Sequence, residues 1–144
     1  MEYNRKLLKE WANGEYWGDY IEREGGFKDD VITKQFKALE QSYFKEIERK
    51  INYCKQLLIQ HTKDFFIYYT LAALSDRQNL DKDPKALYKR QAKFYCLKTL
   101  RLSPGYAPAR RLLSEIESWL QLLGNKRAAK IPAIKIWVGG KEIT

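Results

Sequence analysis

Residues 92–113 contain the pattern that most restricts how this chain can fold. Small side chains at Ala92, Cys96 and Thr99 fall on one face of a predicted helix. Small residues on a helix face allow a neighbouring helix to come close. Pro104 ends the predicted helix, because proline lacks a backbone N–H and clashes with the preceding turn. A second amphipathic run follows at once, so the pattern predicts two antiparallel helices joined by a tight turn.

The same arrangement occurs earlier in the chain when the sequence is shifted by 42 residues. Tyr53-Cys54 then aligns with Tyr95-Cys96, and the corner at Thr62 aligns with the corner at Pro104. A helix, a tight corner and a second helix are therefore predicted twice. Because one helical hairpin cannot bury its own apolar face, we expect the two units to stack against each other.

Helical spacing of apolar residues predicts further helices around these units. Two short aromatic-rich helices are expected before residue 25, separated by a turn at Asn13-Gly14. A long helix is expected over about residues 30–60, since neither Gly nor Pro interrupts it; a break near Lys45 is the alternative. The other predicted helices cover about residues 65–79, 84–102 and 107–123.

Polar residues and glycines predict where several of these helices begin and end. Asp29 or Asp30 is expected to cap the long helix and Asp64 the next one, because a carboxylate accepts hydrogen bonds from free backbone N–H groups. Asp83 followed by Pro84 predicts the start of the helix that runs to about Leu102. The last helix is expected to stop at Gly124-Asn125.

The chain is accordingly predicted to form one all-α domain over residues 1–125, followed by a basic and apolar extended tail over residues 126–144. Within the domain, residues 1–28 would act as aromatic capping helices and residues 50–123 as a repeat-like core. Apolar residues alternate between Ile134 and Val138, which is typical of a strand. Three partners are open for this strand: the chain's own helices, a second copy in a homodimer, or the sheet of another protein.

The region of about residues 50–120 resembles the tetratricopeptide repeat. The positions that match the small, apolar and terminal-proline positions of that family's second helix are Ala92, Cys96, Thr99, Leu100 and Pro104, and the first-helix matches are Tyr68, Leu71, Ala72, Ala109 and Leu113. The earlier copy departs from the pattern at Lys50 and Thr62, where the family has Ala and Pro. The 42-residue period also exceeds the family's period of about 34 residues.

The resemblance implies a short solenoid of stacked antiparallel hairpins that binds a peptide or protein and catalyses no reaction. In this family, first-helix residues line the binding groove. Carried onto this chain, the groove residues are Phe66, Tyr69, Ala73, Asp76, Arg77, Arg111, Glu115 and Ser118, with Trp119 beside them. Tyr69, Ala73 and Glu115 stand where relatives that clamp a C-terminal carboxylate have Lys or Asn, so no such clamp is expected. The alternative is that Phe66 and Trp119 only pack beneath another layer.

Positive charge gathers in the second half of the chain and predicts an acidic partner. The formal net charge is +9, and residues 84–114 hold eight basic residues and no acidic one. An acidic protein is the leading expectation, and an RNA-associated function is the alternative. A basic face that only meets solvent, or that complements the acidic N-terminal part, remains open. The candidate basic surface comprises Lys89, Arg90, Lys93, Lys98, Arg101, Arg110, Lys126, Arg127 and Lys130.

The sequence offers few groups for catalysis. His61 is the only histidine, and Cys54 is seven residues away along the same predicted helix, about 10 Å and too far for a nucleophile–base pair. We find no metal-ligand spacing and no phosphate-binding loop, so we expect no enzyme activity, cofactor or metal. Cys54 and Cys96 are expected to be buried and reduced. Neither a membrane-spanning run nor a secretion signal is expected, and the predicted location is the cytoplasm.

Overall fold

The structure is a computed structural model that describes the whole chain except residues 1–2, 25–31, 80–85, 131–135, 139–140 and 144. Of residues 32–35, 125–130, 136–138 and 141–143 it describes the backbone only. The described chain is α-helical apart from one short β-hairpin, which confirms the predicted all-α class. Its elements are α1 (Arg5–Ala12), α2 (Trp17–Arg23), α3 (Ile32–Gln60), α4 (Phe65–Asp76), α5 (Leu87–Leu102), α6 (Ala107–Lys130), β1 (Ile136–Val138) and β2 (Lys141–Ile143).

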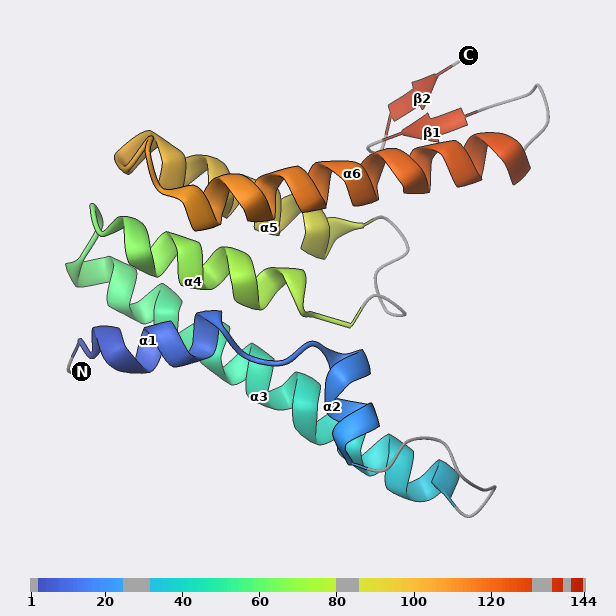
Figure 1. The fold of residues 1–144 in the computed structure, drawn as a ribbon, viewed down its shortest axis with the longest axis horizontal. Helices are drawn as coiled ribbons and strands as arrows, with labels where there is room; N and C mark the ends of the chain where they lie inside the picture. Colours follow the sequence, from blue (N-terminus) through green and yellow to red (C-terminus); the bar gives the residue numbers. More distant parts are fainter. Residues whose placement is uncertain (1–2, 25–31, 80–85, 131–135, 139–140, 144) are drawn as a thin grey trace.

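Helices α1, α4 and α6 form one layer, and α3 and α5 form a second layer behind it (Figure 1). Figure 1 shows α1, α4 and α6 stacked one above another, with α3 and α5 behind them. α4 contacts α1, α3, α5 and α6, and its pairing with α5 is the most extensive. This central position explains why nearly the whole of α4 is buried. One apolar cluster joins α4 to α1 and α3, and a second joins it to α5 and α6.

The two predicted helical hairpins are confirmed, and they are built in the same way. α3 ends at Gln60 and α4 begins at Phe65, while α5 ends at Leu102 and α6 begins at Ala107. The ends of α3 and α5, and likewise the starts of α4 and α6, are therefore 42 residues apart, which is the shift found in the sequence. The long helix α3 is continuous, so the alternative of a break near Lys45 is wrong.

The corners of the two hairpins also share their hydrogen bonds. In each corner, the first residue after the helix donates its backbone N–H to the carbonyl four residues earlier, in the last helical turn. The residue three positions later in the corner donates its own N–H to the carbonyl of that first residue. The bonds are His61 N to Leu57 O (3.0 Å) and Asp64 N to His61 O (3.2 Å) in one corner, and Ser103 N to Thr99 O (2.8 Å) and Tyr106 N to Ser103 O (3.1 Å) in the other. The Asp64 side chain also caps α4, as predicted, by accepting from Phe66 N at 2.9 Å.

Two predicted helix ends are wrong. α5 begins at Leu87 rather than at Pro84, because Ala86 lies in the left-handed region with φ 55° and interrupts the helical path. α4 ends at Asp76, three residues before the predicted Asn79. The proposed caps at Asp29, Asp30 and Asp83 lie outside the described residues.

The predicted stop at Gly124-Asn125 is also wrong, since α6 continues to Lys130. A glycine inside a helix costs only about 1 kcal/mol relative to alanine, and good helix formers follow it here. The predicted boundary at residue 125 therefore falls inside a helix, and residues 126–130 are not extended. Residues 136–138 do form a strand, but it pairs antiparallel with β2 of the same chain, with Trp137 opposite Glu142. β1 also contacts α6.

Candidate binding groove

A small cavity lies between helices α1, α4 and α6, where the resemblance to tetratricopeptide repeats predicts a binding groove. Its volume is about 180 Å³. Tyr69, Ala73, Arg111 and Glu115 line it, all of which are predicted groove residues. The other lining residues are Ala12, Tyr16, Pro108 and Leu112. We call these eight residues the front groove.

Helical spacing explains how the front groove forms. Tyr69 and Ala73 are four residues apart on α4, and Arg111 and Glu115 are four apart on α6, so each pair lies on one helix face. The small Ala12 and Ala73 side chains leave room between the helices. Burial raises the pKa of the Tyr69 hydroxyl, and the positive charge of Arg111 acts in the opposite direction. The groove therefore brings one cation, one carboxylate and two tyrosine side chains together around small and apolar residues such as Ala73 and Leu112.

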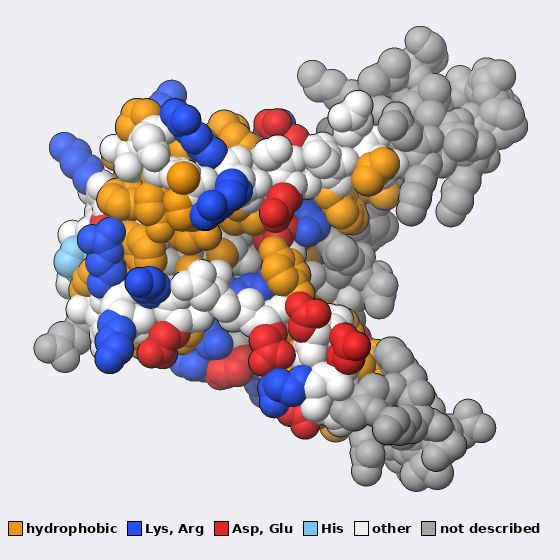
Figure 2. Space-filling view, in the orientation of Figure 1, with side chains coloured by type: hydrophobic (Ala, Val, Ile, Leu, Met, Phe, Trp, Pro, Cys, Tyr) orange, Lys and Arg blue, Asp and Glu red, His pale blue; other side chains and the backbone are white. Residues whose placement is uncertain are grey.

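Aromatic rings cluster where α4 begins and the α5–α6 corner passes beside it. The Tyr106 ring lies 5.0 Å from that of Phe65 and 5.2 Å from that of Tyr69, in edge-to-face arrangements. The Arg5 guanidinium lies 4.8 Å from the Phe66 ring centroid, within cation–π range. Figure 2 shows an apolar patch on this side of the molecule, bordered by Lys and Arg side chains. Phe66 itself is buried, as the alternative interpretation expects.

Two predicted groove residues are withdrawn from the surface by a buried polar cluster. Asp76 is 6% exposed, and its carboxylate accepts hydrogen bonds from the Tyr16 hydroxyl and the Lys89 ammonium. The same ammonium lies 5.3 Å from the Trp119 ring centroid. Burial raises the pKa of the Tyr16 hydroxyl, and the hydrogen bond to Asp76 raises it further. Asp76 is therefore satisfied inside the protein and does not face a ligand.

Arg77 belongs to the same buried cluster, with 5% of its surface exposed. Its guanidinium donates to the backbone carbonyls of Trp11 and, at 3.2 Å, of Ala73. A Cβ at Gly14 would clash with Nη1 of Arg77, so a larger residue there would displace the guanidinium from its place beside the α1–α2 connection. These contacts hold Tyr16 in the wall of the groove. Asn13-Gly14 indicated a turn in the sequence, but nothing local indicated its buried arginine.

The remaining predicted groove residue, Ser118, is exposed on α6 outside the cavity. The structure therefore brings half of the predicted groove together and excludes Phe66, Asp76 and Arg77 by burial. Sequence reasoning missed Ala12, Tyr16, Pro108 and Leu112. Ala12 and Tyr16 were missed because α1 and the connection after it lie far from the repeat units in the sequence, and only the fold brings them to α4.

The residues of the predicted basic surface differ in their surroundings, as far as the structure describes their side chains. Lys89 is a correction, because it is 7% exposed and paired with Asp76. The Nζ atom of Lys93 lies 3.7 Å from Oε1 of Glu117, and Nζ of Lys98 lies 6.0 Å from the Tyr68 ring centroid. Arg90 is half-buried, whereas Arg101 and Arg110 are exposed. Lys126, Arg127 and Lys130 lie on the last turns of α6, where the backbone alone is described.

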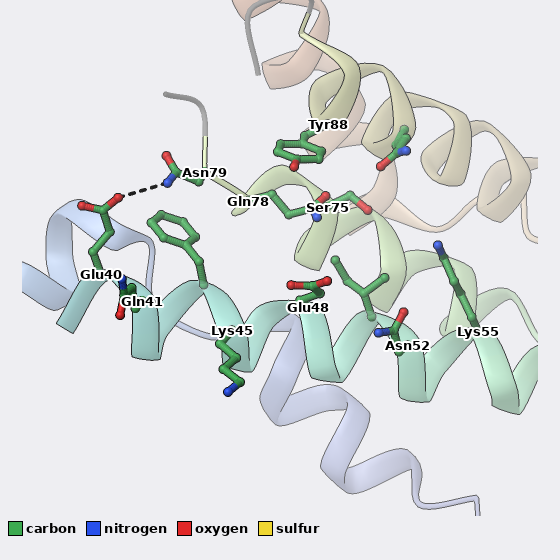
Figure 3. Close-up of a pocket in the computed structure, with 13 residues that line it drawn as sticks. Glu40, Gln41, Lys45, Glu48, Asn52, Lys55, Ser75, Gln78, Asn79 and Tyr88 are labelled. Atoms are coloured by element: carbon green, nitrogen blue, oxygen red, sulfur yellow. Dashed lines mark hydrogen bonds between the residues drawn. The ribbon is translucent and has the colours of Figure 1, made fainter. Parts of the chain in front are cut away.

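A larger pocket of about 530 Å³ lies between α3, the end of α4 and the start of α5, and sequence reasoning did not identify it. Figure 3 shows Glu48 and Tyr88 directed into it from α3 and α5, while Lys45 points away. Asn79 donates to Glu40 at 3.1 Å across one end. Five of the thirteen lining residues carry side-chain amides: Gln41, Asn52, Gln78, Asn79 and Gln91. We call it the α3–α5 pocket.

Cys54, Cys96 and His61, the groups considered for catalysis, have the following surroundings in the structure. Cys54 and Cys96 are free and buried, and burial raises the pKa of each thiol to about 12. The His61 ring packs against Tyr3, with centroids 4.9 Å apart. Within the described part of the chain, no group of three His, Cys, Asp or Glu side chains could hold a metal ion. No described helix combines the length and apolar character needed to cross a membrane.

Comparison of this chain with protein-family models, with curated proteins and with solved structures finds no match.

Proposed function

We propose that the protein is a non-enzymatic scaffold whose front groove binds an acidic segment of another protein. The observation that carries this proposal is the groove itself, in which α1, α4 and α6 bring Tyr69, Arg111 and Leu112 around one small cavity. The resemblance to tetratricopeptide repeats supports the same surface, since that family binds through its first helices. Buried free thiols are compatible with the reducing cytoplasm.

The size of the groove favours an inserted side chain over a complete small molecule. Its volume of about 180 Å³ is below the roughly 300 Å³ at which small-molecule pockets begin. An apolar side chain of the partner would enter between Tyr69 and Leu112. Neighbouring acidic residues of the same segment would then meet Arg111, which is exposed at the edge of the cavity. Glu115, on the next turn, would disfavour an acidic residue placed further along α6.

A selection from a random linear peptide library on the immobilised full chain tests this proposal. We expect the selected peptides to be rich in Asp and Glu around one apolar residue. Their affinity, measured by titration calorimetry, should fall at least tenfold for Arg111→Glu, since a charge reversal replaces attraction by repulsion. Arg49→Glu is the matched control, because Arg49 is an exposed arginine on α3 that lines neither the front groove nor the α3–α5 pocket. Equal losses for both variants would contradict the groove assignment.

An RNA-associated function is the alternative, and the eight basic residues without an acidic one in residues 84–114 are the observation in its favour. Binding to phosphates alone is weak and decreases steeply with salt. We expect a mixed-sequence single-stranded RNA to bind only at low ionic strength and without sequence preference. Tight, sequence-selective RNA binding at physiological salt would favour this alternative over the protein scaffold.

A further inference from the structure

The outer face of α5 exposes large apolar side chains. Phe94 is 55% exposed and Leu97 is 49% exposed, although both lie in the middle of the helix. The opposite face of α5 is fully buried through Ala92, Cys96 and Thr99. Among the described residues, α5 carries four of the seven exposed large hydrophobic side chains, which are Leu87, Phe94, Leu97 and Leu102. Clustered exposed apolar residues mark interaction sites more often than scattered ones.

The repeat supplies an internal reference for this face. Shifted back by 42 residues, Phe94 corresponds to Asn52 of α3, and Leu97 corresponds to Lys55. Both α3 residues are exposed, as their α5 counterparts are. The same place in the same hairpin is therefore polar in one copy and apolar in the other. Since the hairpin folds with polar residues there, its stability does not require Phe94 and Leu97 to be apolar.

The first hairpin also shows what kind of element fits beside this face. Asn52 and Lys55 belong to one wall of the α3–α5 pocket, and Tyr88 and Gln91 of α5 belong to the facing wall (Figure 3). Within the described chain, the helices that pack extensively on α5 are α4 and α6, and they cover the face that carries Ala92 and Cys96. A partner helix on the outer face of α5 would pack directly on Phe94, whereas α3 and α5 are separated by the polar α3–α5 pocket.

The residues on this face have the spacing of a helix-packing seam. Leu87, Phe94 and Leu97 lie on one side of α5, at steps of seven and three, and apolar residues at such steps suit contact with a neighbouring helix; Arg101 follows Leu97 by four residues at the edge of this apolar strip. The charges select the partner. Besides Lys89, which is buried against Asp76, α5 carries the basic residues Arg90, Lys93, Lys98 and Arg101 and no Asp or Glu. A second copy of α5 would therefore bring like charges together, whereas an acidic helix would be attracted.

We propose that the outer face of α5 binds an amphipathic, acid-rich helix of another protein. Leucine-like side chains of that helix pack on Phe94 and Leu97, and its flanking carboxylates meet Arg101 and the half-buried Lys98. This surface is separate from the front groove, and the proposal does not depend on the function assigned to that groove.

A pair of designed peptides tests the proposal. One is a synthetic helix of about three heptads with Leu at positions a and d and Glu at the flanking positions, and the other has Lys in place of every Glu. Each is titrated with the full chain and followed by fluorescence anisotropy. We expect micromolar binding of the acidic peptide and at least tenfold weaker binding of the basic one.

The matched variant is Phe94→Asn combined with Leu97→Lys, which installs the residues that α3 carries at these places. We expect it to bind the acidic peptide at least tenfold more weakly, although the added lysine increases the positive charge. Its circular-dichroism melting curve should match that of the parent chain, because both side chains are exposed. Arg111→Glu should leave this binding unchanged, which separates it from the front groove.

Two results would overturn the proposal. The first is equal affinity of the acidic peptide for the parent chain and the double variant, which would mean that charge alone attracts it. The second is a dimer of the parent chain in sedimentation that the double variant abolishes, which would identify a second copy as the occupant of this face.

Discussion

The two helical hairpins have the same corners but different packing faces. α3 places the large side chain of Leu57 in the core beside α4, whereas α5 places the smaller Thr99 at the corresponding position. Small residues let two helix backbones approach closely, in agreement with the extensive pairing of α4 and α5. Large side chains thus fill the space between α3 and α4, whereas small side chains let the backbones of α5 and α4 approach closely. The corner geometry is what the two hairpins share, so it is the more robust part of the motif.

The polar cluster around Asp76 is the second difference between the hairpins. Ile47 of α3 is buried among apolar residues, while its counterpart Lys89 is buried against a carboxylate. This pair joins α4 to α5, and its contacts with Tyr16 and Trp119 extend to the α2 connection and α6. The second hairpin therefore depends on a charge pair at a place where the first depends on an aliphatic side chain.

Replacing Lys89 by Ile, the residue of the first hairpin, should have the largest effect. The change leaves the Asp76 carboxylate buried with only the Tyr16 hydroxyl as a described side-chain partner. Removing one member of a buried ion pair costs about 3–5 kcal/mol. We expect the free energy of unfolding, measured with urea, to fall by that amount.

Removing the second charge as well should restore most of this loss. In the double variant Asp76→Leu with Lys89→Ile, an apolar pair replaces the ion pair, and such replacements are often neutral or stabilising. If the double variant were as unstable as Lys89→Ile alone, the pair would not be the cause of the loss.

Truncation of the matched residues Leu57 and Thr99 tests the difference in packing directly. Leu57→Ala removes a large buried aliphatic side chain and should cost about 2–5 kcal/mol. Thr99→Ala removes one methyl and a hydroxyl that donates to Tyr95 O at 2.7 Å, and should cost about 1 kcal/mol. Urea unfolding of both variants gives the comparison. Equal losses would mean that the two helix faces are packed alike.

The sequence predicts the repeated corners because their determinants are local. Pro104, the small face of α5 and the 42-residue shift all act within one hairpin, and the structure bears them out. The incorrect ends have a different origin. The stop at Gly124 fails because a modest helix-propensity cost does not end a helix that good helix formers continue.

The site was predicted less well than the fold because it depends on contacts between distant segments. Asp76 and Lys89 are thirteen residues apart with a helix start between them, and each reads as an ordinary surface charge. Only their pairing inside the fold removes both from the surface. Tyr16 shows the reverse case, since α1 and its connection bring it 60 residues along the chain to Asp76 and the groove.

High pH should weaken both hairpins through one matched pair of thiols. Cys54 and Cys96 have folded-state pKa values of about 12, against an ordinary value of 9. Below pH 9 each thiol is neutral in both states, so stability is unaffected. Above pH 9 only the unfolded chain releases these protons, so each thiol lowers the free energy of unfolding by about 1.4 kcal/mol per pH unit.

Urea unfolding between pH 8 and pH 10.5 measures this slope. The double variant Cys54→Ala with Cys96→Ala should be less stable at pH 8, because of the lost sulfur contacts, but less sensitive to pH. Part of the slope should remain, since burial also raises the pKa of Tyr43 to about 12. An unchanged slope would mean that the thiols are not the groups that resist ionisation.

The smallest expected effect distinguishes the two corners. Asp64 caps α4 through its side chain, whereas its counterpart Tyr106 packs its ring on Phe65 and Tyr69. Asp64→Ala should lower the free energy of unfolding by about 1 kcal/mol, because Phe66 N loses its acceptor. Asp64→Asn keeps an acceptor and should be nearly neutral. If both variants lost the same stability, the charge of Asp64 rather than its hydrogen bond to Phe66 N would stabilise the first corner. The contrast between a hydrogen-bonded first corner and an aromatic second corner would then be wrong.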